Sequence, residues 1–161
     1  MTNYLEIKKE LETLIQGEIF NDQETLKKYS RDASLFEVWP KLVIWPKNVD
    51  DIKNLVKFVS KNKSKYGDLS ITARAAGSCM SGGSLNESII IDFTKYLNHF
   101  SIDAEEERAS VEPGVFYRDF ELETLKHDLI LPCYTASKNL CALGGMIGNN
   151  CAGEKTLAYG K

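Results

Sequence analysis

Two glycine-rich segments constrain what this 161-residue chain can fold into. The first, Arg74 to Gly83 (RAAGSCMSGG), lies between two stretches rich in β-branched residues, 69–73 and 88–93. This order predicts a strand, a turn poor in side chains and a second strand. Successive backbone N–H groups without side-chain cover form a concavity for an anion, which suits a pyrophosphate. A tight turn without a ligand is the alternative interpretation of this segment when it is considered alone.

Two common phosphate-binding motifs do not fit the first segment. A P-loop requires GxxxxGK[ST]; Gly77 and Gly82 have the required spacing, but Gly83 stands where the lysine should be. The dinucleotide motif GxGxxG opens a helix, whereas here the spacing differs and a strand follows. The sequence therefore disfavours hydrolysis of a nucleoside triphosphate and a Rossmann-type NAD site.

The second segment, Leu143 to Gly153 (LGGMIGNNCAG), is followed by LAYGK at the end of the chain. Together with the first segment, this block resembles the FAD-binding domain of FAD-linked oxidases related to vanillyl-alcohol oxidase, in the D-lactate dehydrogenase and glycolate oxidase branch. The resemblance covers residues 38–161, and two ordered motifs are more specific than either alone. It implies an α+β fold, with a complete first α/β subdomain and the start of a second.

The same resemblance predicts the domain organisation. We expect residues 1–37 to form a helical lead-in, 38–112 the first FAD-binding subdomain with its pyrophosphate loop, and 113–161 the truncated start of the second subdomain. Relatives of this type continue into further flavin-binding and substrate-binding parts. We therefore expect an N-terminal fragment that is inert by itself.

Periodicity and capping residues predict the individual elements. We expect a helix over 3–16 with Gly17 as its C-cap and Leu5, Leu11, Leu14 and Ile15 on one face. We also expect a helix over 22–29, a strand over 42–45 and a hairpin of 99–103 with 108–112. A further helix should begin at Asn48, with one side formed by Val49, Ile52, Leu55, Val56 and Val59. The last expected helix covers 116–125, and its apolar positions are Phe116, Phe120, Leu122 and Leu125.

The resemblance also implies which residues hold FAD. These candidate cofactor-binding residues are Ala75, Ala76, Gly77, Ser78, Cys79, Met80, Ser81, Gly82, Pro132, Ser137, Gly144, Gly145, Asn149, Asn150 and Gly153. Ser78 stands where covalent relatives carry a flavin-linking histidine, so non-covalent FAD is expected, weakly bound or absent in the fragment. Arg74 is expected to fix the loop by bonding carbonyl groups, and Cys151 to be a packing residue.

Composition excludes several function classes. A net charge of −3 and a pI near 5.5 disfavour nucleic acid as a partner. Neither the four cysteines nor the two histidines have zinc-ligand spacing, and HExxH and GxSxG motifs are absent, so we predict no metal site and no catalytic residue in the chain. The sequence shows neither a signal peptide nor an apolar run of membrane-spanning length. We expect a cytoplasmic location, with peripheral association at the inner face of the cell membrane left open.

The resulting functional hypothesis is the FAD-binding part of a 2-hydroxy-acid dehydrogenase, which would move a hydride from the substrate α-carbon to flavin N5 and pass electrons to an acceptor such as a quinone. One alternative is a non-catalytic module or subunit that completes a flavoprotein with a partner chain. Another is a phosphate binder unrelated to flavin. We also expect the fragment to self-associate through a surface around Leu140, Leu143, Met146 and Ile147.

Overall fold

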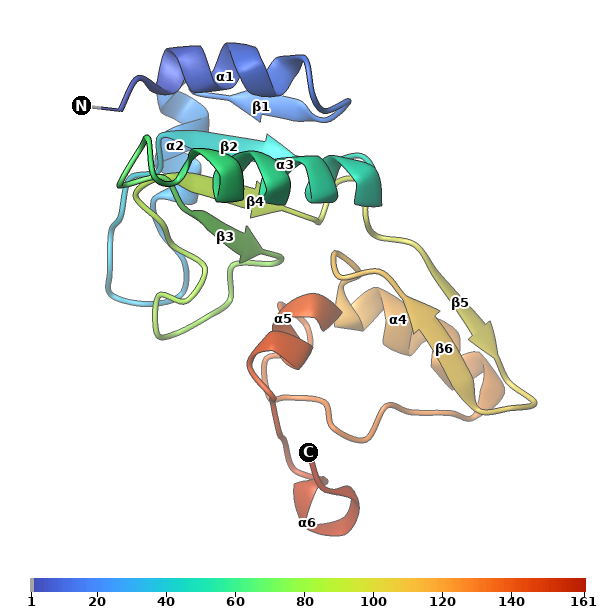
Figure 1. Cartoon of the computed structure of the whole chain (residues 1–161). Coiled ribbons are helices and arrows are strands. Elements are labelled where there is room, and N and C mark those ends of the chain that lie inside the picture. Colours follow the sequence, from blue (N-terminus) through green and yellow to red (C-terminus); the bar gives the residue numbers. More distant parts are fainter. Residues whose placement is uncertain (1) are drawn as a thin grey trace.

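A four-stranded sheet forms the N-terminal part of the molecule in the computed structural model, which describes residues 2–161 (Figure 1). Its strands are β1 (Glu18–Phe20), β2 (Leu42–Trp45), β3 (Ile71–Arg74) and β4 (Ile89–Asp92). Their order in the sheet is β1-β2-β4-β3. β4 runs parallel to both of its neighbours, and β1 is antiparallel to β2. The carboxyl ends of the three parallel strands therefore lie along one edge of the sheet.

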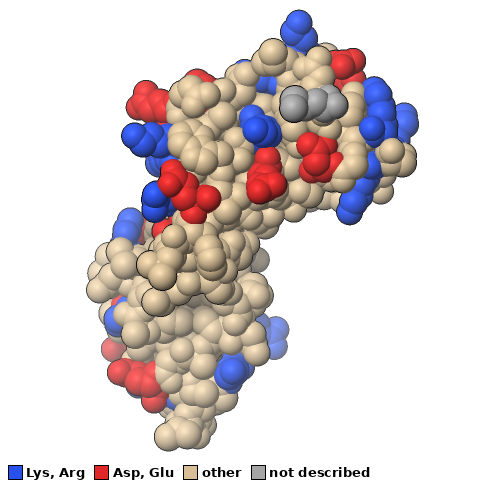
Figure 2. Space-filling model, turned by 90° about the vertical axis from the view of Figure 1, so that its left-hand side faces the viewer, with Lys and Arg blue, Asp and Glu red and all other residues tan. Residues whose placement is uncertain are grey.

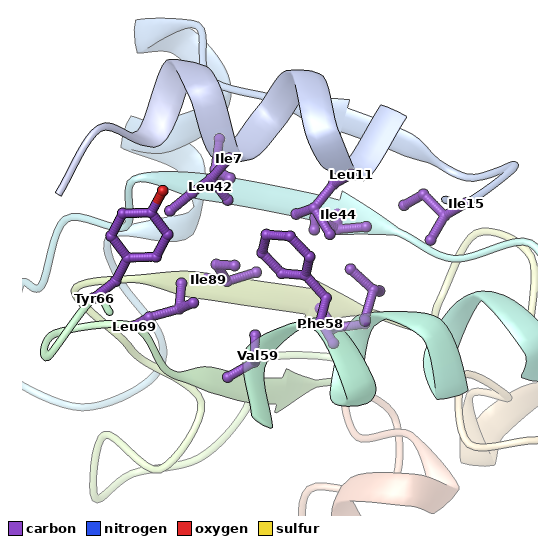
Figure 3. Close-up of a cluster of buried hydrophobic side chains, with 12 residues drawn as sticks. Ile7, Leu11, Ile15, Leu42, Ile44, Phe58, Val59, Tyr66, Leu69 and Ile89 are labelled. Atoms are coloured by element: carbon purple, nitrogen blue, oxygen red, sulfur yellow. The ribbon is translucent and has the colours of Figure 1, made fainter. Parts of the chain in front are cut away.

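Helices cover both faces of this sheet, which explains the apolar runs 42–45 and 89–91 in its two central strands. The helices are α1 (Tyr4–Glu12), α2 (Gln23–Tyr29) and α3 (Val49–Asn62). In β2, Leu42 and Ile44 point to the α1 and α3 side, as Figure 3 shows, while Val43 packs with Leu26 of α2 on the other side. Alternate side chains of a strand thus enter two separate cores.

The first glycine segment follows β3 as expected, and side-chain caps fix the start of each of the three helices. The caps are Asn3, Asp22 and Asn48, and each accepts a hydrogen bond from a backbone N–H in the first turn of its helix. The predicted start of α3 after Asn48 is therefore confirmed. β1 was not predicted, because a three-residue edge strand carries too few residues to display a period of two.

The predicted apolar faces of α1 and α3 were partly wrong. α1 buries Ile7 and Leu11, whereas Leu5 is 62% exposed. α3 buries Phe58 beside Leu55 and Val59, and leaves Val49 and Val56 exposed. Several faces of each helix contain apolar residues, so the rotation of the helix is decided by the strands it packs on.

The predicted C-cap of the first helix was also wrong. α1 ends at Glu12, with Thr13 as its C-cap. Gly17 instead lies where the chain enters β1, and a Cβ at this position would collide with the Trp45 carbonyl oxygen. This glycine therefore permits a close approach of two backbones.

A smaller unit follows the sheet (Figure 1). The predicted hairpin is present as β5 (Phe100–Asp103) and β6 (Arg108–Val111), which pair antiparallel. The remaining elements are α4 (Tyr117–Thr124), the 3-10 turn η1 (Leu125–His127), α5 (Leu143–Gly148) and α6 (Thr156–Tyr159). The second glycine segment is thus helical over its first half.

This unit has its own hydrophobic core. The buried members are Val115, Tyr117, Phe120, Cys141, Leu143 and Met146. The expected face of α4 was therefore wrong in part, because Leu122 and Leu125 are exposed. The expected self-association surface also needs correction: Leu143 and Met146 are buried, and only Leu140 and Ile147 are exposed.

Charged side chains of both signs lie on the face drawn in Figure 2. On this face, lysines and arginines lie beside aspartates and glutamates, and a group of lysines and arginines lines the right-hand edge of the upper part. Among residues 2–161, no helix has the length and apolar character needed to cross a membrane.

Candidate cofactor-binding site

A cavity of about 280 Å³ lies between the segment that follows β3 and the helix α5. Residues 75–84 form that segment, here called the glycine loop. The cavity is lined by Ala73, Arg74, Ala75, Ala76, Gly77, Ser78, Cys79, Gly83, Ser84, Phe93, Pro113, Ala142, Gly144, Gly145, Gly148 and Asn149. Small side chains dominate this lining, so a bound molecule would meet backbone peptide groups. The position beyond the carboxyl ends of parallel strands is where α/β sheets commonly bind ligands.

Two glycines of the loop adopt backbone conformations that side chains disfavour. Gly77 has φ +67° and Gly82 has φ +78°. A Cβ at Gly77 would collide with the guanidinium group of Arg74, and one at Gly82 would lie 3.0 Å from Cδ2 of Phe36. The loop therefore needs glycine at both positions for its shape.

Arg74 lies beneath the glycine loop. Its Nη2 donates to the carbonyl oxygen of Arg31 at 2.9 Å and its Nη1 to that of Tyr29 at 3.4 Å. The guanidinium carbon also lies 5.1 Å from the centroid of the Tyr29 ring. The expected carbonyl bonds exist, but they tie the start of the loop to residues 29–31. Burial lowers the pKa of Arg74, although arginine remains charged at neutral pH, so a cation contributes to the cavity wall.

A buried polar network supports Arg74 from the sheet side. The Tyr29 hydroxyl donates to Asp92 Oδ2 at 2.8 Å and accepts from Trp45 Nε1 at 2.9 Å. Asp92 pairs with Arg74 in the register of β3 and β4. Burial, with the adjacent Asp92 carboxylate, raises the pKa of Tyr29 far above its usual value. Tyr29 is therefore a neutral donor at physiological pH.

The thiol of Cys79 is held by polar groups of the glycine loop itself. Its Sγ lies 3.2 Å from Ser81 Oγ. Hydrogen bonds from the Ser81 side chain and from the backbone N–H groups of Ser81 and Gly83 hold the pKa of the thiol below its usual value. The thiol of Cys79 and the hydroxyl of Ser81 therefore contact each other within the loop.

On the opposite wall, the glycines of α5 have different roles. Gly144 packs against Pro113, where a Cβ would lie only 2.7 Å from the proline Cβ, and its N–H donates to the Pro113 carbonyl oxygen at 2.9 Å. Side chains at Gly145 or Gly148 would meet no atom within 4 Å. Packing therefore does not require glycine at these two positions, and the space beside them belongs to the cavity.

The structure brings together eight of the residues predicted from sequence. Ala75, Ala76, Gly77, Ser78, Cys79, Gly144, Gly145 and Asn149 all line the cavity. Met80, Ser81 and Gly82 lie in the outer part of the glycine loop, and Met80 is 83% exposed. The remaining predicted residues lie elsewhere: Pro132, Ser137, Asn150 and Gly153 are outside the cavity lining.

Two of these outlying residues line a second, larger depression. Pro132 and Asn150 border an apolar groove of about 1170 Å³ beside β6, which also includes Phe120, Leu131 and Ile147. Asn150 has φ +44° one residue beyond the C-cap Asn149 of α5, and its N–H donates to the Ile147 carbonyl oxygen, so its conformation ends the helix. Gly153 allows close packing, because a Cβ there would collide with the Tyr134 carbonyl oxygen.

Sequence reasoning missed several lining residues. Ser84, Phe93 and Pro113 reach the cavity from three separate segments. The position of Phe93 directly after β4 was the one available signal, because the carboxyl ends of adjacent parallel strands meet at one edge. Ser84 and Pro113 carried no such signal.

Cys151 lies among other thiols. Its Sγ donates to the Cys133 carbonyl oxygen at 3.6 Å. Burial, with the nearby Cys133 and Cys141 thiols, raises the pKa of Cys151. This environment disfavours a reactive thiolate. Within residues 2–161, no cluster of three or more His, Cys, Asp or Glu side chains is arranged to hold a metal ion.

The arrangement of sheet, glycine loop and α5 defines an α+β fold found among FAD-linked oxidases. The chain superimposes on alkyldihydroxyacetonephosphate synthase with a TM-score of 0.80 at 20% identity, covering 99% of this chain and 32% of that structure. Wild-type BBE-like 1 of Physcomitrella patens gives a TM-score of 0.77 at 17% identity, covering 96% and 33%. At these identities the likeness establishes the fold alone.

The sequence assigns the chain to a family. Residues 40–161 match the FAD binding domain family, and the chain belongs to it. Among curated relatives, D-2-hydroxyglutarate dehydrogenase of Haemophilus influenzae is 27% identical over 147 residues, which are 91% of this chain and 14% of the relative. Glycolate oxidase subunit GlcD of Bacillus subtilis is 28% identical over 159 residues, 96% of this chain and 33% of the relative. The chain thus spans from about a seventh to a third of these two proteins.

Proposed function

We propose that this chain is the FAD-binding module of a flavin-dependent 2-hydroxy-acid dehydrogenase, and that its cavity holds the phosphates of non-covalent FAD. The observation that carries the proposal is the cavity between the glycine loop and α5, with peptide groups and Arg74 in its wall. Its volume of about 280 Å³ lies just below the range of about 300–1,000 Å³ that is usual for ligand pockets. The cavity therefore suits one part of a dinucleotide, with the flavin ring reaching beyond it.

The residues present suit a phosphate-bearing group. Backbone N–H groups of Ala75 to Ser78 would bind the pyrophosphate oxygens, and the Arg74 charge behind Gly77 would favour an anion. Gly145 and Gly148 leave the opposite side open, where Asn149 would contribute its side-chain amide. Ser78 supplies no imidazole for a covalent flavin bond. When bound, FAD supplies hydride-accepting chemistry, while these residues bind and orient it.

The proposed substrate class follows the curated relatives. By their names, they act on D-2-hydroxyglutarate, glycolate or D-lactate, all of which are small 2-hydroxy acids. The electron acceptor proposed is a quinone or a similar small oxidant. No residue of this chain is assigned to proton transfer from the substrate, so we propose that the chain alone is inert toward hydroxy acids.

A panel of cofactor fragments tests the proposal. FAD and ADP both contain a pyrophosphate, whereas riboflavin contains none, so isothermal titration of the three compounds isolates the phosphate contribution. We expect FAD and ADP to bind weakly, and riboflavin to give no binding at the same concentrations. Binding of riboflavin equal to that of FAD, or no binding of either pyrophosphate compound, would contradict the proposal.

A second candidate function is that of a subunit which completes a flavoprotein with a partner chain. The observation in its favour is the apolar groove beside β6, whose lining includes Ile102, Phe120 and Ile147. The hairpin β5–β6 is a two-stranded sheet, and such sheets are marginally stable without further cover. Light scattering tests whether the partner is a second copy of this chain: a dimer would favour a groove shared between two copies, and a monomer would exclude that form of the candidate.

A further inference from the structure

Residues 30–38, here called the lead-in loop, lie over the glycine loop and are internally ordered. The Val38 N–H donates to the Ser30 carbonyl oxygen at 2.8 Å, which closes the base of the lead-in loop. Within it, the Ser34 N–H donates to Asp32 Oδ1 at 2.9 Å, and the Phe36 N–H donates to Ser34 Oγ at 3.2 Å. The side chain of Asp32 is therefore held in place from its own segment.

The lead-in loop contacts the residue that precedes the glycine loop and the far part of that loop. Before the glycine loop, Arg74 donates to the Arg31 carbonyl oxygen. In its far part, Gly82 lies against the Phe36 ring. At the end, Ser84 Oγ donates to Asp32 Oδ2 at 3.0 Å. Ser84 is 7% exposed and lines the cavity, whereas Asp32 does not line it.

We infer that Asp32 is a positioning residue of the candidate cofactor site, which acts through Ser84 to fix the far end of the glycine loop. The inference rests on the proposed function, because it takes the cavity to be the site of the FAD phosphates. Oδ1 of Asp32 accepts from the Ser34 backbone and Oδ2 from Ser84, so each carboxylate oxygen has a donor. If the far end of the glycine loop is rigid, the first half of the loop keeps its shape before an anion binds. The free-energy cost of ordering the loop on binding is then smaller.

The electrostatic environment of Asp32 agrees with this role. Partial burial alone would raise the pKa of Asp32, but hydrogen bonds from Ser34 and Ser84, with the positive charge of Arg74, hold it below its usual value. Asp32 is therefore charged at neutral pH, and both of its hydrogen bonds are charge-assisted. Such bonds are stronger than bonds between neutral groups.

The test measures loop order directly, independently of cofactor binding. Asp32→Ala removes both acceptors, whereas Asp32→Asn keeps an acceptor for the Ser34 N–H and an amide that can donate to Ser84 Oγ. Asp50→Ala is the matched control, because Asp50 is an exposed carboxylate paired with Lys53 on α3 and does not line the cavity. Amide hydrogen exchange of residues 78–84 is measured in the full 161-residue chain, together with the FAD dissociation constant.

We expect Asp32→Ala to speed exchange at residues 78–84 by about tenfold, the low end for a lost hydrogen bond to a charged group. Asp50→Ala should stay within about twofold of the parent chain. Asp32→Asn should speed exchange less than Asp32→Ala does, because it keeps both hydrogen bonds but makes them the weaker bonds of neutral groups. Ser84→Ala should match Asp32→Ala, and the double variant should be no worse than either single variant. Exchange in β4 should not change, which separates loop disorder from unfolding.

Three results would overturn the inference. The exchange rate of residues 78–84 could be the same in Asp32→Ala as in Asp50→Ala, or Asp32→Asn could speed exchange as much as Asp32→Ala. The effects of Asp32→Ala and Ser84→Ala could also add in the double variant. If the parent chain binds no FAD, the proposed function fails while the exchange data still decide the role of Asp32. If the parent binds FAD, Asp32→Ala should weaken binding by a similar factor of about ten, and unchanged affinity with a disordered loop end would overturn the link to the cofactor.

Discussion

Adding a side chain at Gly145 should stabilise the protein while it blocks the cofactor cavity. Gly145 lies within α5, its φ is not in the left-handed region, and a Cβ there meets no atom within 4 Å. Replacing glycine by alanine in a helix stabilises by about 0.5–1 kcal/mol, because the unfolded chain loses freedom. For a chain of this size that corresponds to a rise in Tm of about 1–4 °C.

The same position faces the space proposed for FAD. Gly145→Leu would place a branched side chain into a cavity of about 280 Å³. We expect FAD and ADP affinity to fall at least about tenfold, equivalent to about 1.4 kcal/mol, without loss of folded structure. Circular dichroism follows Tm, and titration calorimetry follows affinity.

Gly67→Ala is the matched control for Gly145. Gly67 also has open space around its Cβ position and lies outside the cavity lining. It should leave FAD affinity unchanged. Two results would refute the reasoning: a lower Tm for Gly145→Ala, which would mean that the α5 conformation is wrong, or unaltered FAD binding by Gly145→Leu, which would mean that the cofactor lies elsewhere.

Three further predictions concern the glycine loop and the polar network behind it. Gly82→Ala should destabilise by about 1–2 kcal/mol in urea unfolding, because φ +78° disfavours a side chain and the Cβ would press on Phe36. Any flavin bound to the chain should leave on acid precipitation, because Ser78 offers no covalent link; yellow protein pellets would point to Cys151. The pKa of Tyr29 is raised in the folded protein. Its contribution to the free energy of unfolding is therefore complete below about pH 10 and declines as the pH rises toward the folded-state pKa, because in this range only the tyrosine of the unfolded chain ionises. Tyr29→Phe should therefore show a shallower loss of stability above about pH 10, and an identical slope would contradict the assigned burial.

The local features of the fold were predictable from sequence. The runs around 42–45 and 89–92 are rich in β-branched residues and indicate strands, because a strand covered on both faces is apolar on both sides. Asn48 indicates the start of a helix, because its side chain caps a backbone N–H of the first turn. The rotation of α1 was not predictable in this way. Both Leu5 and Ile7 are apolar, and the sheet selects Ile7.

The site was predictable only in part for a similar reason. The sequence treats Gly144 and Gly145 alike, yet Pro113 packs on the first and the cavity lies beside the second. The contact of Ser84 with Asp32 joins residues 52 positions apart. Periodicity and local motifs carry no information about such contacts, which depend on how the lead-in loop crosses the glycine loop.

The most direct test of the proposed cofactor site is an NMR titration of the ¹⁵N-labelled chain with FAD. The proposal predicts that shifted amides form one continuous set in the first half of the glycine loop and at Gly144, Gly145 and Asn149, and that ADP reproduces most of this set. Amides that line only the groove beside β6, such as those of Phe120, Leu131 and Asn150, should not move. Shifts confined to that groove, or no shifts at millimolar FAD, would contradict the claim that this cavity holds the cofactor phosphates.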